Sequence, residues 1–208
     1  MNLPAGRYTN ILVIVTAVIW LALDLAGWLG WASVMAGFIP ARVMGPALDG
    51  AVPVILTPLS AVFVHANMAH IAFNMVMLFL CGRYTEYALG SGGFASLYII
   101  GAYASAAAHY LVDPTSIVPM VGASGAISAV VGAYALLFGQ KRARAIGPVP
   151  AAVVNILWLA AAWIGVQLLI QVATASSGIL VAVAAQVGGF FAGILLARPL
   201  LLWRYRSA

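Results

Sequence analysis

The stretch GASGAISAVVGAYALLFGQ, residues 122–140, carries no charge and consists mainly of small and aliphatic side chains. Such a stretch is typical of a helix that crosses a membrane. The rest of the chain has the same character, because 65% of its 208 residues are hydrophobic and 6% are charged. Soluble domains are roughly half apolar and about a quarter charged. The composition therefore predicts an all-α, polytopic membrane protein.

Apolar runs bounded by charged residues, proline or glycine predict six membrane spans. Because one spanning helix takes about 20 residues, these spans fill most of the chain and predict a single membrane domain over residues 1–208. The connection at residues 32–60 contains several prolines and cannot span, but its apolar side chains predict that it rests in the membrane interface. The predicted spans are residues 10–31, 61–82, 92–111, 122–140, 150–173 and 178–203.

The basic residues are scattered between the spans, so they indicate topology and not a nucleic-acid-binding surface. If the N-terminus lies in the cytoplasm, only Arg42 of the nine basic residues falls on the outer side. This asymmetry predicts that both termini are cytoplasmic. The single Cys81 cannot form an internal disulfide, and we expect no metal centre and no cofactor. The predicted cytoplasmic residues are Arg7, Arg83, Lys141, Arg142, Arg144, Arg198, Arg204 and Arg206.

Polar side chains inside spans are candidates for function, although many only join helices. The second span holds His65, His70 and Asn74, and the last two lie four residues apart on one helix face. Because Pro119 precedes the fourth span, we expect its helix to begin near Ser124, below the outer membrane surface and beside a water-filled cavity.

Small residues predict that the fourth and sixth spans pack closely together. On this face we expect Gln186 of the sixth span to reach Ser124 as a structural, hydrogen-bonded amide. We expect Glu86 and Arg83 to cap and anchor the cytoplasmic side. The small residues are Ser124, Ser128 and Gly132 in the fourth span, and Ala185, Gly189, Gly193 and Ala197 in the sixth.

Four spaced motifs occur in a fixed order between about Phe38 and Gly193. They are His65-x4-His70-x3-Asn74, Gly82-x3-Glu86-x3-Gly90, Gly122-Ala-Ser124-Gly125 and Gly189-x3-Gly193. With these motifs the chain resembles the rhomboid family of intramembrane serine proteases. The resemblance implies a six-span rhomboid-like bundle in a bacterial inner membrane. Its substrates would be single-span membrane proteins, admitted between the second and fifth spans and cut near the outer face.

The resemblance also implies a role for each polar residue of these motifs. Ser124 would be the nucleophile, and His70, Asn74 and the Ser124 N–H would form the oxyanion site beside Gly122. His65 would support the outer rim, with an interfacial, structural position as its plainest interpretation.

The chain departs from the family at Gln186, where peptide-cutting members carry the histidine that pairs with the serine. A carboxamide has no useful basicity, so it cannot take the proton from Ser124 or return it to the leaving amine. Losing the nucleophile or base of a serine hydrolase costs on the order of 10⁶ in turnover. We therefore expect a strongly impaired endopeptidase. The alternative is a pseudoprotease that holds transmembrane clients without cutting them.

Two further ionisable residues leave other hypotheses open. His109, at the outer end of the third span, is a substitute base in one interpretation and an interfacial histidine in the favoured one. Asp24, which we place at depth in the first span, would be an ion site in a transporter, together with the amides Asn155, Gln167 and Gln171. A simple hydrogen bond to a neighbouring helix is favoured for Asp24. The sequence carries no signal for an oligomeric state.

Overall fold

The computed structural model describes residues 3–139, 144–173 and 179–206, and these residues form helices joined by turns and loops. Two isolated bridges are the nearest approach to β structure in these ranges. The predicted all-α fold is therefore confirmed. The longer helices are α1 (Arg7–Leu25), α2 (Leu29–Ala36), α3 (Thr57–Ser60), α4 (Met68–Val112), α5 (Ser124–Phe138), α6 (Ala151–Ala173) and α7 (Ile179–Arg204), and the short 3₁₀ helices are η1 (Pro40–Arg42), η2 (Val54–Leu56) and η3 (Ala61–Phe63). Lys141 and Arg142 lie outside the described residues.

Four helices among the described residues are long and apolar enough to cross a membrane, namely α1, α4, α6 and α7. The 45-residue α4 consists of two helices joined at Gly90, whose φ of 73° and ψ of 165° are not helical. This conformation suits glycine because it has no Cβ. The helix α5 is shorter, at 15 residues, as expected for a helix that begins at Ser124. The four long helices therefore provide five apolar helical segments, and α5 adds a short sixth.

The predicted boundaries of the first two spans are wrong. The first does not reach residue 31, because α1 ends at Leu25 and the chain turns at Gly27, whose φ is 71°. The second does not begin at residue 61, because η3 and a loop precede α4. Asn67 caps α4 by accepting a hydrogen bond from the His70 N–H at 2.9 Å. Apolar composition alone does not distinguish such a loop from a helix.

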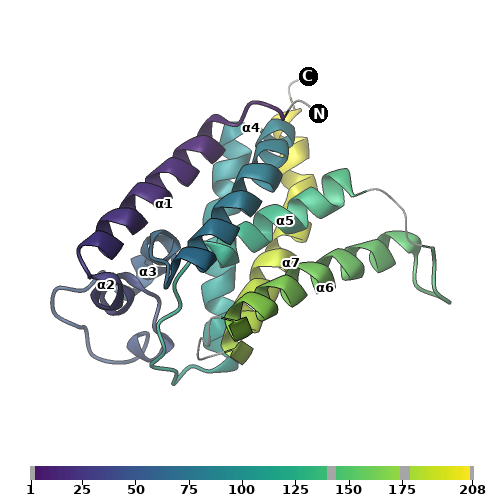
Figure 1. Cartoon of the computed structure of the whole chain (residues 1–208). Coiled ribbons are helices and arrows are strands. Elements are labelled where there is room, and N and C mark those ends of the chain that lie inside the picture. The colour runs from purple at the N-terminus through teal and green to yellow at the C-terminus, as the bar shows by residue number, and fades with distance from the viewer. Residues whose placement is uncertain (1–2, 140–143, 174–178, 207–208) are drawn as a thin grey trace.

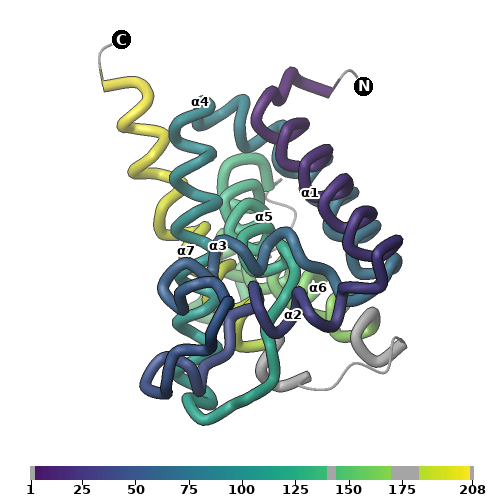
Figure 2. Tube along the Cα trace, turned by 90° about the vertical axis from the view of Figure 1, so that its left-hand side faces the viewer, coloured from purple at the N-terminus to yellow at the C-terminus, as the bar shows by residue number. Residues whose placement is uncertain are grey.

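The helix α5 lies in the middle of the bundle, with α1, α4, α6 and α7 around it (Figure 2). Most of its side chains are buried, and they pack against α4 and α7. A Cβ on Gly193 of α7 would collide with the Ala129 carbonyl oxygen, and one on Gly132 would collide with the Phe190 carbonyl oxygen. The predicted close packing of the fourth and sixth spans is confirmed.

The N-terminus of α1 is capped by the carboxylate of Glu86 from α4. The Glu86 side chain is 5% exposed, and it accepts hydrogen bonds from the Tyr8 N–H at 3.0 Å and from the Thr9 N–H and hydroxyl, both at 2.8 Å. Beside it, Arg83 donates from Nε and Nη2 to Asn10 Oδ1 at 3.1 and 2.9 Å. Glu86 therefore caps α1 and Arg83 anchors it, which fits the predicted cap and anchor, and the cytoplasmic position of this end stays a prediction.

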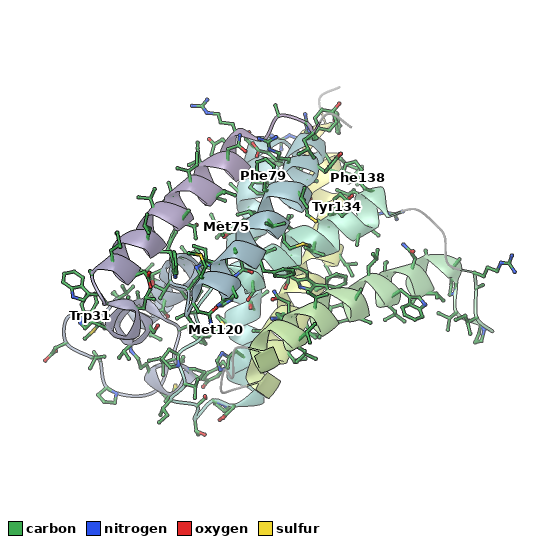
Figure 3. All side chains as sticks on the ribbon, in the orientation of Figure 1. Trp31, Met75, Phe79, Met120, Tyr134 and Phe138 are labelled. Carbon is green, nitrogen blue, oxygen red and sulfur yellow. The ribbon has the colours of Figure 1, made fainter. Side chains whose placement is uncertain are left out.

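Three chain segments meet at this end of the bundle. The start of α1, the bend of α4 and the end of α7 lie together (Figure 1), and Arg204 donates a hydrogen bond to the Tyr87 carbonyl. Phe79, Tyr134 and Phe138 lie toward this end, whereas Trp31 lies at the opposite end (Figure 3). Basic and aromatic residues at the ends of an apolar bundle are typical of membrane proteins.

The connection between α1 and α4 is folded against the chain that precedes α5. Phe38 and Met120 exchange two backbone hydrogen bonds of 3.0 and 2.8 Å, and Ala41 donates to the Ser116 carbonyl at 3.1 Å. Apolar side chains still project from this connection, since Met44 is 87% exposed and Ile55 is 71% exposed. These exposed groups suit the predicted interfacial position.

We expect Glu86→Gln to destabilise the protein, because an amide N–H₂ would face the backbone donors of α1 that the carboxylate now satisfies. The loss should be about 2 kcal/mol, measured as a lower apparent Tm in detergent. Asp24→Asn is the control, since it removes a carboxylate that is exposed in the last turn of α1. An equal shift in both variants would contradict the capping role of Glu86.

Candidate functional site

The backbone just before α5 is held by two segments that precede α4. The Gly122 N–H donates to the Ala61 carbonyl at 2.9 Å, and the Ala123 N–H donates to His65 Nε2 at 3.3 Å. The His65 carbonyl in turn accepts from Trp20 Nε1 at 3.1 Å. His65 thus fixes the approach to Ser124, which is the first residue of α5.

His65 was predicted to be an interfacial histidine within the second span, and its placement within that span is wrong. Its side chain is 0% exposed, and it lies in the loop before α4 because that helix begins only at Met68. The expected structural role nevertheless fits its bond to Ala123. Hydropathy could not reveal this bond, which joins residues 58 positions apart.

His70 and Asn74 lie on one face of α4, directly against Gly122. A Cβ built on Gly122 would lie 2.5 Å from His70 Cε1 and 3.6 Å from Asn74 Nδ2. Gly122 also has a φ of 105°, which side chains rarely adopt. The ring of His65 lies edge-on to that of His70, with centroids 5.0 Å apart. The structure therefore brings together the polar residues that were predicted to share a site.

Asn74 is fully buried, yet neither its Oδ1 nor its Nδ2 has a hydrogen-bond partner. Most buried side-chain amides are bonded, so an unbonded one calls for an explanation. Asn74 Nδ2 can donate to a negatively charged oxygen that develops close to Gly122 and the N-terminus of α5. The N–H groups in the first turn of α5 also lack acceptors within the helix. Together they form a group of donors suited to an oxyanion.

Ser124 lies at this helix N-terminus and is half-buried. Its carbonyl accepts a hydrogen bond from the Ser128 hydroxyl at 2.7 Å. Ser128 Oγ accepts in turn from Trp163 Nε1 at 2.8 Å, which ties α6 to the first turn of α5. The sequence did not indicate Trp163, because a tryptophan in an apolar span is usually read as facing lipid or packing in the core.

Gln186 lies near the same helix N-terminus. Gly189 and Gly193 of α7 approach Gly125 and Ala129 of α5, so the two helices run in register. Gln186, about one turn before Gly189, is therefore level with the start of α5. Its side chain is 3% exposed, and Oε1 has no hydrogen-bond partner. The predicted satisfied amide is wrong for this oxygen, which does not accept from Ser124.

His109, which was expected to be an interfacial histidine, is buried inside the bundle near the end of α4. It is 1% exposed, its ring lies edge-on to Phe38 with centroids 5.9 Å apart, and neither ring nitrogen is hydrogen-bonded. Ser105, one turn earlier on α4, lies against Gly125 and also has an unbonded hydroxyl oxygen. His109 therefore lies buried on the face of α4 that adjoins the site.

Asp24 was predicted to lie at depth in the first span, but it lies at the end of that helix. It is exposed in the last turn of α1, which ends at Leu25. The amides proposed for a transporter are spread over α6, where Gln167 is 2% exposed and Nε2 has no partner. The side chain of Gln171 lies outside the described residues. Asp24 and Gln167 thus do not form one site with each other.

We expect Gly122→Ala to destabilise the protein by about 1–3 kcal/mol, since alanine is strained at this φ and its methyl group collides with the His70 ring. The apparent Tm in detergent measures this loss. Gly165→Ala is the control, because nothing lies within 4 Å of a Cβ at Gly165 within α6. A Gly122→Ala variant as stable as Gly165→Ala would show that His70 does not pack as described.

The chain is similar in sequence to known proteins. Residues 54–203 match the Rhomboid domain. The chain is 35% identical over 89 residues to the rhomboid protease GluP of Bacillus subtilis, and this aligned part is 42% of this chain and 16% of that protein. It is 33% identical over 76 residues to the human rhomboid-related protein 3, and this aligned part is 36% of this chain and 18% of that protein. The aligned part is thus under a fifth of either relative's length, whereas the domain match covers most of this chain. The chain therefore belongs to the rhomboid family.

Proposed function

We propose that this chain is a six-span intramembrane serine endopeptidase scaffold of rhomboid type, whose turnover is strongly reduced because Gln186 stands at the position of the general base. Its substrates are single-span transmembrane proteins, cut near the outer face of the membrane. The observation that supports this proposal best is the packing of His70 and Asn74 against Gly122, two residues before Ser124.

In the proposed reaction the Ser124 hydroxyl attacks a peptide carbonyl carbon at the N-terminus of α5. The carbonyl oxygen then gains negative charge, and Asn74 Nδ2, His70 and the Ser124 N–H are the donors that would stabilise it. Asn74 suits this role because its amide is buried without a partner. A donor that is already desolvated loses little when the oxyanion forms.

The missing step is proton transfer. Imidazole acts as a base because its pKa is near neutral, whereas an amide stays uncharged and binds no proton at any ordinary pH. Gln186 is buried beside the helix N-terminus and cannot deprotonate Ser124. His65 Nε2 already accepts from the Ala123 N–H, so it is occupied as well. The site therefore retains binding and oxyanion groups without an assigned base.

Substrates would enter sideways, between α4 and α6. The helix α6 diverges from its neighbours in Figure 1, and on its outer side Trp158 is 68% exposed. Between these two helices the ring of Phe73 stacks on that of Trp163, with ring centroids 5.7 Å apart. Trp163 also donates to Ser128, whose hydroxyl donates to the Ser124 carbonyl, so a movement of α6 would shift the backbone at Ser124.

A second function, binding without cleavage, is favoured by Gln186 alone. A pseudoprotease would use the same lateral entrance and donor groups to hold transmembrane clients. In both functions the chain lies in a bacterial inner membrane, with both termini in the cytoplasm, and needs no cofactor. Transport is not favoured, because Asp24 is exposed at the end of α1.

The decisive change is Gln186→His, tested in proteoliposomes with a cleavable transmembrane reporter. We expect the unaltered chain to cut slowly or not at all, and Gln186→His to gain at least about 10²-fold in cleavage rate, because general base catalysis is worth that much. Adding Ser124→Ala to Gln186→His should abolish the gain. Gln167→His is the matched control, since Gln167 is a second buried glutamine, on α6.

The same experiment separates the two functions. Retention of uncut reporter by the unaltered chain, with no cleavage at any enzyme concentration, would favour the pseudoprotease. Efficient cleavage by the unaltered chain that is lost in Ser124→Ala would refute the impairment, and His109→Gln would then be the next variant to examine. If Gln167→His gained as much activity as Gln186→His, the role of position 186 would be wrong.

A further inference from the structure

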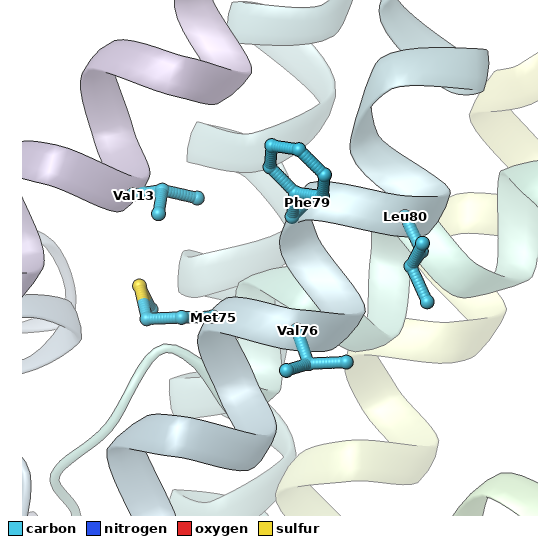
Figure 4. Close-up of a pocket in the computed structure, with 5 residues that line it drawn as sticks. All are labelled: Val13, Met75, Val76, Phe79 and Leu80. Carbon is cyan, nitrogen blue, oxygen red and sulfur yellow. The ribbon is translucent and has the colours of Figure 1, made fainter. Parts of the chain in front are cut away.

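A groove lies between α1 and the first half of α4, away from the candidate site. It is lined by Val13 of α1 and by Met75, Val76, Phe79 and Leu80 of α4 (Figure 4), and it has a volume of about 300 Å³. All of these side chains are apolar. Val76 is 54% exposed and Leu80 is 44% exposed, so the groove opens toward the surroundings of the bundle.

A positive charge lies beside one of the residues that line the groove. Arg83 lies one turn beyond Phe79 on α4, and its Cζ is 4.1 Å from the centroid of the Phe79 ring. On the other side of the groove, Arg83 Nε and Nη2 donate to Asn10 Oδ1 of α1, three residues before Val13. The guanidinium therefore bridges the two helices that form the groove.

The charge of Arg83 is not balanced by the groups that hold it. Among the described residues its hydrogen-bond partner is the neutral Asn10, and both bonds use Nε and Nη2, so the Nη1 donors are available to a ligand. The nearby carboxylate of Glu86 accepts hydrogen bonds from backbone and hydroxyl donors of Tyr8, Thr9 and Ser91 and keeps its single negative charge. Arg7, which is exposed at the start of α1, adds a second cation, so the two cations outnumber this carboxylate. The region around Arg83 thus favours an anion.

We propose that this groove binds an anionic glycerophospholipid, with one acyl chain along Val13, Met75, Val76 and Leu80 and the phosphate against Arg83. The dimensions fit, because Arg83 lies about 12 Å along the helix axis from Met75, and this length matches much of one acyl chain in a leaflet. A guanidinium is well suited to phosphate, since it offers several donors in one plane. The lipid would fasten α1 to α4 and is independent of peptide cleavage.

A phospholipid fits the groove better than a free anion does. An inorganic phosphate would contact Arg83 but would leave the apolar lining uncovered. A neutral phospholipid would fill the lining but would gain less from the unbalanced cation. The combination of an apolar groove and a cation beside it selects a lipid whose headgroup carries net negative charge.

The test uses the full chain in detergent and measures lipid binding by native mass spectrometry. Phosphatidylglycerol and phosphatidylcholine with identical acyl chains are titrated separately. We expect phosphatidylglycerol to bind about fivefold more tightly or better, since one basic residue near anionic lipid contributes about that factor. Arg83→Gln should remove this preference, and Arg83→Lys should retain part of it.

Two further variants locate the site. Val76→Trp fills the groove and should weaken both lipids, whereas Arg198→Gln, an exposed arginine on α7, should leave the preference unchanged. The apparent Tm of each variant shows whether it has folded. If Val76→Trp has not folded, the lipid preferences of Arg83→Gln and Arg83→Lys decide whether the proposal holds. The proposal would be overturned if both lipids bound equally, or if Arg83→Gln kept the preference for phosphatidylglycerol. It would also be overturned if inorganic phosphate displaced bound phosphatidylglycerol as well as free phosphatidylglycerol does.

Discussion

Backbone contact between α5 and its neighbours is the constraint on which the rest of the bundle depends. Gly125 of α5 lies against Ser105 of α4, and Gly189 of α7 lies against the Gly125 carbonyl. In a membrane the hydrophobic effect does not drive helices together, so such close packing has to supply the association. A side chain larger than hydrogen at these glycines would push α5 away from the centre of the bundle.

The central position of α5 explains how a polar site exists in so apolar a chain. A helix N-terminus leaves several N–H groups unbonded, which is costly in hydrocarbon. Here the surrounding helices and the loop at His65 shield that terminus, and His65 and Ala61 bond the N–H groups just before it. His65, His70, Asn74 and Gln186 are thereby gathered near Ser124 at one helix end.

The sequence predicted those features that depend on local composition. Apolar runs identified the helices, Pro119 indicated a late start for α5, and the glycine spacing indicated its packing against α7. The start of α4 was missed because residues 61–67 are as apolar as a span, although they form a 3₁₀ turn and a loop. The bonds from His65 to Ala123 and from Trp163 to Ser128 join distant segments, and no local pattern encodes such pairings.

The distribution of the site over the chain bears on the order of assembly during synthesis. His65, His70 and Asn74 emerge from the ribosome well before Ser124, and Gln186 follows after α6. Chains fold from the N-terminus as they are made, so α1 and α4 can be joined through Glu86 while α7 is still missing. The serine then acquires its last neighbour only when α7 inserts, and a nascent chain lacks the complete site until that moment.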